Sequence, residues 1–291
     1  MNLLLAGLAL ASTVQADPGE MRGVWVVRTA LASPESVDAV VDDAARAGLN
    51  ALFVQVRGRG DALYRSAIVP RSEVLQAQPA DFDPLARVLS RARARGLQVH
   101  AWINVLLAGG FAVPLPAGHV AALHPEWLMV PRSAAARALE ARPAELLALI
   151  EARRDPDAEG LYLSPSVPEA AAHLEAVVRE LVGAYAVDGL HLDFIRYPAR
   201  DYDYSRAALT AFRARRGRGW LLDAPEADPA GWAAHRGAAL EALVGRLART
   251  ARAARPSIVI SAAVVPEAAA MRDKGQAWPG WVRKGDRKSV V

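Results

Sequence analysis

The sequence predicts an α/β fold of the TIM (β/α)8-barrel type, and three observations support this prediction. Short apolar segments with strand character alternate with longer segments rich in alanine, arginine and glutamate, an order that gives parallel strands joined by helices. The later strands carry bulky or polar residues on one face, whereas strands of an open doubly wound sheet are apolar on both faces. The first strand is not followed by the glycine-rich loop of a dinucleotide-binding fold.

Five strands and four main helices can be placed in order along the chain. The helices begin at an N-cap residue followed by proline, as at Ser33 and Pro34, and end before a glycine such as Gly48. A long excursion separates the third strand from the next helix. The expected strands are residues 23–28, 51–56, 98–104, 189–193 and 257–262, and the expected helices are residues 33–47, 83–95, 168–186 and 232–254.

The composition indicates a globular protein and narrows its chemistry. The 291 residues are 53% hydrophobic, which is enough for a substantial core. The net charge is only +4, and the basic residues, nearly all arginine, are interspersed with acids. No nucleic-acid partner is therefore expected. Because the sequence contains no cysteine, disulfides, thiolate metal sites and a cysteine nucleophile are excluded.

The start of the sequence has the character of a targeting segment. Residues 1–16 hold a short apolar run and end in the small-x-small pattern of Val14, Gln15 and Ala16. This pattern predicts a signal peptide that is cleaved near Ala16, and hence export to the periplasm or the extracellular space. The run is too short to span a bilayer, and no other segment of the sequence is long enough.

The last residues differ in composition from the rest. Residues 286–291 match what a common sequencing adapter encodes in one frame, so we expect a non-native tail after a domain over residues 17–285. The barrel would then be incomplete after the fifth strand or the helix that follows it. Such a chain should form an open arc of five parallel strands with apolar area exposed beside the fifth, and it should fold poorly and lack activity.

The most informative motif lies at the end of the fourth expected strand, where residues 191–198 are HLDFIRYP. Side chains alternate between the faces of a strand, so His191 and Asp193 share one face. A carboxylate at such a strand end is costly to bury unless partners stabilise it or chemistry requires it. The motif therefore predicts a functional site centred on Asp193.

Neighbouring strands extend this polar face. Arg57 ends the second strand, and Trp102 and Asn104 end the third, so we expect them near Asp193 at the mouth of the barrel. A less favoured alternative is a metal-dependent hydrolase in which His191 and Asp193 are two ligands. A closed set of three or more such ligands is not visible in the sequence, so no metal or cofactor is expected.

Taken in order, these motifs resemble the glycosyl-hydrolase-like 10 family of bacterial, usually exported proteins with a TIM-barrel domain. The resemblance covers about residues 21–285 and implies hydrolysis of a bacterial cell-wall or other polysaccharide glycan. Phe194 is a departure, because many relatives carry a second acid there; a catalytically silent glycan-binding barrel is therefore the alternative. The segments that carry the resemblance are residues 22–25, 55–57, 60–64, 100–104, 124–127 and 188–198.

Glycoside hydrolysis by this route needs two carboxyl groups, one protonated and one ionised. We expect Asp193 to be the ionised one, held charged by His191 and Arg196, although an Asp193–Arg196 pair could instead be structural. The candidates for the second carboxyl are Glu267, just after the fifth strand, and Asp61, in the loop after the second. Either could also be an ordinary surface acid.

Further side chains are expected to contact the sugar. Arg57, Asn104 and Tyr197 have the chemistry to form hydrogen bonds with sugar hydroxyls, and Asp61 lies in a loop at the same mouth. Trp102 could stack on a pyranose face, or it could fill a layer of the barrel interior.

Overall fold

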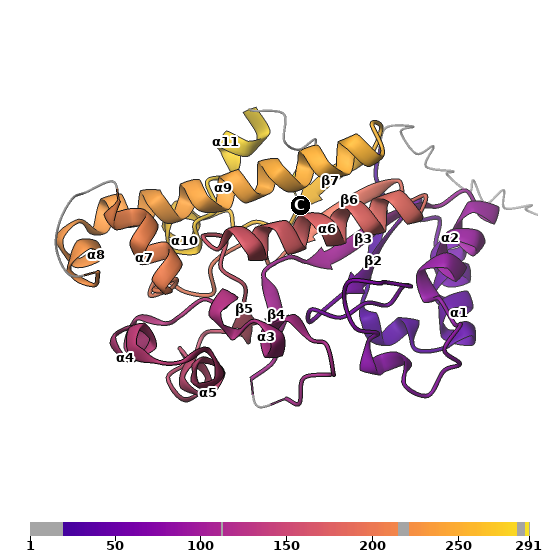
Figure 1. Ribbon diagram of the computed structural model, residues 1–291. Helices are drawn as coiled ribbons and strands as arrows, with labels where there is room; N and C mark the ends of the chain where they lie inside the picture. The colour runs from indigo at the N-terminus through magenta and orange to yellow at the C-terminus, as the bar shows by residue number, and fades with distance from the viewer. Residues whose placement is uncertain (1–19, 112, 215–220, 284–288, 291) are drawn as a thin grey trace, which may run out of the picture.

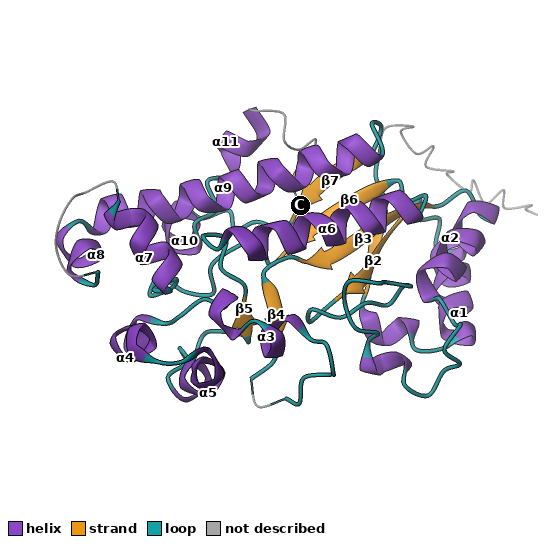
Figure 2. Ribbon diagram, in the orientation of Figure 1, coloured by secondary structure: helices purple, strands orange, loops and turns teal. Residues whose placement is uncertain are grey.

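The computed structural model describes residues 20–111, 113–214, 221–283 and 289–290 (Figure 1). Its centre is a six-stranded parallel sheet in the order β1-β2-β3-β6-β7-β8 (Figure 2). Residues 1–16, the predicted signal peptide, lie outside the described residues. The strands of this sheet are β1 (Gly23–Val26), β2 (Ala51–Arg57), β3 (Gln98–Asn104), β6 (Gly189–Asp193), β7 (Val259–Ala262) and β8 (Ser289–Val290).

Helices connect these strands, and two of the longest, α6 and α9, lie side by side across one face of the sheet (Figure 2). A small antiparallel sheet of β4 (Leu107–Gly109) and β5 (Leu161–Tyr162) follows the carboxyl end of β3. None of the helices in the described ranges is long and apolar enough to cross a membrane. The α-helices are α1 (Pro34–Arg46), α2 (Pro84–Ala94), α3 (Val120–Leu123), α4 (Ala135–Glu140), α5 (Pro143–Ala152), α6 (Pro168–Ala184), α7 (Arg206–Arg213), α8 (Asp223–Ala227), α9 (Pro229–Ala254), α10 (Ala268–Lys274) and α11 (Trp278–Arg283), and the 3-10 helices are η1 (Arg28–Leu31), η2 (Glu73–Leu75), η3 (Pro125–Trp127) and η4 (Arg132–Ala134).

The five expected strands are confirmed in order, but the sheet contains a sixth. The two-residue strand β8 pairs with β7 and falls within residues 286–291, so the expected arc of five strands is corrected to six. Strand addition uses backbone groups, which every residue carries, so composition could not predict it. Exposed apolar side chains are found at the opposite edge of the sheet, where Met21, Trp25 and Val27 are each more than two-fifths exposed.

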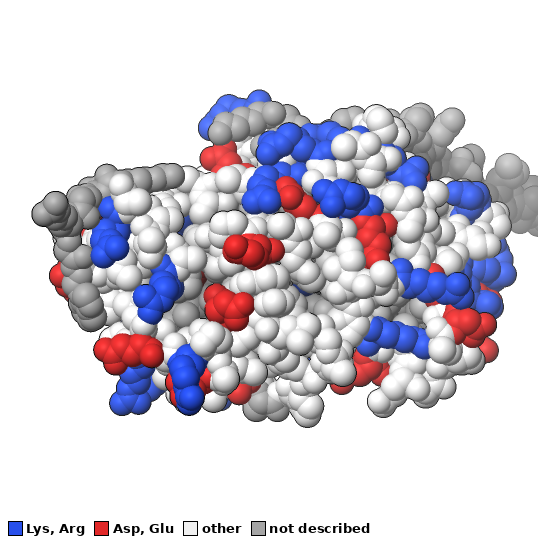
Figure 3. All heavy atoms as spheres, in the orientation of Figure 1, with Lys and Arg blue, Asp and Glu red and all other residues white. Residues whose placement is uncertain are grey.

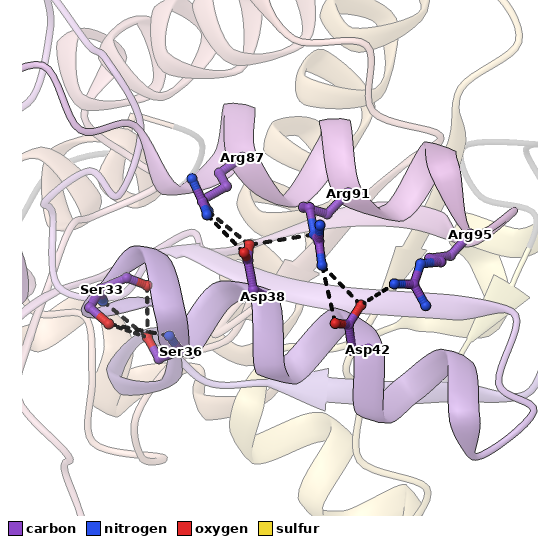
Figure 4. Close-up of polar contacts among 7 residues, drawn as sticks. All are labelled: Ser33, Ser36, Asp38, Asp42, Arg87, Arg91 and Arg95. Carbon is purple, nitrogen blue, oxygen red and sulfur yellow. Dashed lines mark hydrogen bonds and ion pairs between the residues drawn. The ribbon is translucent and has the colours of Figure 1, made fainter.

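The helix ends follow the expected capping chemistry. The Ser33 hydroxyl accepts a hydrogen bond from the Ser36 backbone at the start of α1, and the Ser36 hydroxyl accepts one from the Ser33 backbone (Figure 4). Asp83 caps α2 in the same way. Gly48, just after α1, has φ 70°, a conformation that favours glycine. These caps fix where the helices begin and end. The longer loops therefore lie between the carboxyl end of each strand and the helix that follows it.

Charged side chains of both signs are interspersed on the face of the molecule shown in Figure 3. The clearest arrangement is a row of ion pairs between α1 and α2, in which Arg87 and Arg91 contact Asp38 while Arg91 and Arg95 contact Asp42 (Figure 4). All of these groups are at least partly open to solvent, so the row orients the two helices more than it stabilises them.

Aromatic side chains pack against one another on one face of the sheet. Trp25 packs against Phe53 and, edge to face, against His191. His100 lies opposite Gly189 in the pairing of β3 with β6. A Cβ atom on Gly189 would lie 2.0 Å from Nδ1 of His100, so the two strands pack this closely only because residue 189 is glycine.

Gly189→Ala is expected to destabilise the protein by about 1–3 kcal/mol or more, because the buried His100 ring has to move. Gly183→Ala is the matched control, since a Cβ there meets nothing within 4 Å and alanine favours a helix. Urea unfolding measures both variants. Equal stability of the two would contradict the close packing of β3 on β6.

Candidate active site

Asp193 ends β6, and its carboxyl group is held from both sides. Oδ1 accepts a hydrogen bond from the Phe194 backbone at 2.6 Å, and Oδ2 accepts one from Nε1 of Trp102 at 3.1 Å. Burial nevertheless outweighs these bonds and the charge of Arg196, so the pKa of Asp193 is raised above its ordinary value. This shift disfavours the ionised state that is expected from the sequence.

Phe194 turns the chain away from the strand in a strained conformation. Its φ is 48°, which is rare for a bulky residue and costs on the order of 1–3 kcal/mol. The turn directs the Phe194 backbone nitrogen back to the Asp193 carboxyl. It also brings the Phe194 ring beneath the guanidinium of Arg196, whose Cζ atom lies 4.7 Å from the ring centroid. The strain is therefore located where the strand end and its loop meet.

Trp102 and Asn104 connect Asp193 to the neighbouring strands. Nε1 of Trp102 also donates to Oδ1 of Asn104 at 3.0 Å, and Nδ2 of Asn104 donates to the Gly58 carbonyl at 2.8 Å. Nε2 of Gln55 reaches the same Asn104 oxygen at 3.4 Å. This network fixes the orientation of the indole, whose ring remains partly exposed. The predicted grouping of Trp102, Asn104 and Asp193 at one end of the sheet is present.

A second carboxyl group, Glu159, lies at this site and was not identified from the sequence. It precedes β5, and it accepts hydrogen bonds from Nη2 of Arg196 at 2.8 Å and from the Tyr162 hydroxyl at 2.5 Å. Burial acts to raise the pKa of Glu159, but these two partners hold it below the ordinary value. In the sequence, the one local sign of this residue is an acid that directly precedes a glycine, Gly160. The structure shows why glycine is needed there, because a Cβ at residue 160 would lie 2.0 Å from the Gly109 carbonyl oxygen.

Arg57 is not open to a ligand, because a β-bulge changes its place in the sheet. The register shifts between Gln55 and Arg57, so that Arg57 pairs with Ile103. Its side chain is fully buried and donates to the backbone carbonyls of Asn104 and Val105. In place of the predicted sugar contact, Arg57 supports the carboxyl end of β3.

Tyr197 and His191 are also fully buried. The Tyr197 hydroxyl donates to the Arg236 carbonyl at 3.2 Å, and Gly275 packs so closely that a Cβ would lie 2.7 Å from the tyrosine ring. Nδ1 of His191 is 2.8 Å from Oγ of Ser261 on β7. Tyr197 is therefore not exposed to a sugar, as the sequence predicts it to be. The hydrogen bond of His191 through Nδ1 goes to Ser261 and not to the Asp193 carboxyl.

The two expected partner acids, Asp61 and Glu267, have surroundings of their own. Asp61 is buried, accepts a hydrogen bond from the Arg59 backbone at 2.8 Å and lies 3.7 Å from Arg28. Burial acts to raise the pKa of Asp61, yet its polar contacts and nearby positive charges hold it below the ordinary value. Glu267 is exposed at the N-cap of α10. The charges that shift the pKa of Asp193 belong to Arg196 and Glu159.

The site thus contains two carboxyl groups, Asp193 and Glu159, joined through the loop that carries Arg196. Within the described ranges, no three His, Asp or Glu side chains are grouped so as to hold a metal ion. The partly exposed Trp102 indole lies beside Asp193. Such an arrangement can exchange protons with a bound ligand and offer it an aromatic surface.

Together these features define a TIM-barrel-type α/β protein with a polar site at the carboxyl ends of its strands. The fold is shared with the glycoside hydrolase domain of PgaB (BpsB) from Bordetella bronchiseptica, at a TM-score of 0.65 and 17% identity over 93% of this chain and 73% of that one. The α-L-fucosidase isoenzyme 2 of Paenibacillus thiaminolyticus has a TM-score of 0.57 at 18% identity, over 83% of this chain and 32% of that one.

The chain belongs to the glycosyl hydrolase-like 10 family, whose model matches residues 20–291. It is 28% identical to the glycosyl hydrolase YngK of Bacillus subtilis over 165 residues, which are 55% of this chain and 27% of that protein. It is 26% identical to the glycosyl hydrolase DigH of Escherichia coli over 224 residues, 69% of this chain and 46% of that protein. The chain therefore spans less than half the length of these relatives.

The raised pKa of Asp193 predicts a specific dependence of stability on pH. The folded protein holds this proton more tightly than the unfolded chain, whose aspartates titrate near about 3.9. The contribution of Asp193 to stability therefore falls as the pH rises from that value through the raised folded-state pKa. Asp193→Asn removes this contribution, so the stability of the variant relative to wild type should increase between about pH 3 and about pH 7.

Urea unfolding of both proteins across this range measures the difference. Glu159 and the other acids titrate in both proteins, so the comparison isolates residue 193. A difference that is constant with pH, or that moves in the opposite direction, would show that Asp193 is not held protonated by burial.

Proposed function

We propose that this protein is a glycoside hydrolase that cleaves a bacterial cell-wall or other polysaccharide glycan by carboxyl acid/base chemistry. Membership of the glycosyl hydrolase-like 10 family and a barrel-type fold shared with glycoside hydrolases support this proposal. The relatives YngK and DigH are both named glycosyl hydrolases. Because the chain spans only part of their length, the activity and the substrate are proposed for this site and are not transferred from them.

The observation that carries the proposal is the partly buried carboxyl group of Asp193 at the strand end. A general acid must hold its proton near neutral pH, and burial shifts the pKa of Asp193 in that direction. Trp102 and the Phe194 backbone hold the carboxyl in one orientation. The adjoining indole offers a face on which a sugar ring could stack.

The proposed place of action is outside the cytoplasm. The apolar run of residues 1–16 motivates this part of the proposal. A polysaccharide is too large to enter a cell, so a hydrolase of this class has to reach its substrate in the envelope or beyond it. Export is tested by finding the mature protein in the periplasmic or culture fraction with a new N-terminus near Asp17.

Asp193→Asn should lower kcat on peptide-free cell-wall glycan strands by about 100-fold to 10,000-fold, because the leaving oxygen loses its proton donor. New reducing ends measure turnover. Asp38→Asn, a substitution in the exposed ion-pair row of α1, is the control and should leave kcat unchanged. Thermal melts show that each variant is folded.

The alternative, a silent barrel that binds glycan, gives a different result. Wild type and Asp193→Asn would then bind the strands equally and release no reducing ends. Binding without turnover in both proteins would overturn the enzymatic proposal.

A further inference from the structure

We propose that Glu159 is the second carboxyl group of this site and works as the base opposite Asp193, the proton donor. The inference rests on the proposed glycosidase function and adds the identity and role of the partner. It replaces the candidates Glu267 and Asp61, which occupy other surroundings.

The first support is the way the Asp193 loop reaches Glu159. Arg196 follows Asp193 by three residues, and its Nη2 forms an ion pair with Oε1 of Glu159 at 2.8 Å. The arginine side chain is only 19% exposed, whereas that of Glu159 is 39% exposed. Glu159 is therefore held by a partly buried cation on one side and remains open to a ligand on the other.

The second support is a pair of aromatic contacts that connects the Asp193 loop to the partners of Glu159. The Phe194 ring lies 4.7 Å below the Arg196 guanidinium carbon, and its centroid is 6.1 Å from that of Tyr162. Tyr162 in turn donates its hydroxyl hydrogen bond to Glu159. Asp193 ends β6 and Glu159 precedes β5, and the Phe194 ring, next to Asp193 in the chain, contacts both side chains that bind Glu159.

The third support is that the surroundings of the two acids separate their charge states. Burial raises the pKa of Asp193, whereas Tyr162 and Arg196 outweigh burial and lower the pKa of Glu159. Lys274, at the end of α10, adds a further positive charge within electrostatic range of Glu159. Two carboxyl groups whose pKa values are pushed apart in this way are suited to act as acid and base.

These roles give a balanced hydrolytic step. The glycosidic C–O bond breaks, its electron pair passes to the leaving oxygen, and that oxygen takes the proton of Asp193. A water oxygen bonds to the anomeric carbon and gives one proton to Glu159. The Glu159 proton then passes to solvent and Asp193 takes one up, so both groups return to their starting states and one water is consumed.

The test is turnover of peptide-free cell-wall glycan strands by Glu159→Gln. Gln keeps one oxygen that can accept from Arg196, and its amide nitrogen can donate to the Tyr162 hydroxyl, so the variant should remain folded while kcat falls by about 100-fold or more. Wild type should lose activity on the acidic side as Glu159 is protonated and on the alkaline side as Asp193 is ionised. The acidic limb should be absent from the residual activity of Glu159→Gln.

Two further variants separate a catalytic role from a structural one. Glu159→Ala should regain at least about tenfold of its lost rate with added azide or formate, small anions that can take the place of a missing carboxylate. Glu175→Gln is the matched control, because Glu175 forms the same kind of pair with Arg246, at 2.7 Å, between α6 and α9. It should leave kcat and the pH profile unchanged.

The failure of this inference is distinguishable from failure of the proposed function. If Asp193→Asn loses activity while Glu159→Gln keeps the wild-type rate, Glu159 is not the base and the glycosidase proposal stands. A loss in Glu159→Gln that keeps the acidic limb, with no rescue of Glu159→Ala by azide or formate, likewise overturns the catalytic role. If wild type itself releases no reducing ends, both proposals fall.

Discussion

The site depends on the register in which β6 pairs with β3. In this register Asn104 lies opposite Asp193 and Trp102 lies opposite His191, which brings the Trp102 indole nitrogen to the Asp193 carboxyl. A slip of one residue would turn every side chain of β6 to the other face of the sheet. Gly189 makes this pairing possible, because it leaves room for the buried His100 ring.

Within that frame, the two carboxyl groups are treated differently by their surroundings. Asp193 lies in a partly buried position where ionisation is disfavoured, and Glu159 lies beside Arg196 where ionisation is favoured. The strained backbone of Phe194 forms the turn that connects these two environments. A carboxyl group whose ionisation is disfavoured and a strained turn beside it both cost stability, and such costs are concentrated at functional sites.

Local pattern was sufficient to predict five of the six strands of the sheet, the caps of α1 and α2 and the grouping of Trp102, Asn104 and Asp193, because alternation and capping act over a few residues. It was not sufficient where distant segments decide the outcome. The bulge that buries Arg57 and the contact of Gly275 with Tyr197 depend on tertiary packing. Glu159 precedes a strand of only two residues, which is too short to show any periodicity.

The proposed chemistry requires that this mouth holds one carboxyl protonated and the other ionised. A carbon NMR titration of the wild-type protein, with the Asp193 and Glu159 carboxyl signals assigned through Asp193→Asn and Glu159→Gln, tests it most directly. We expect Asp193 to titrate above the usual range for aspartate and Glu159 to titrate below the usual range for glutamate. Titration of Asp193 below Glu159 would contradict it.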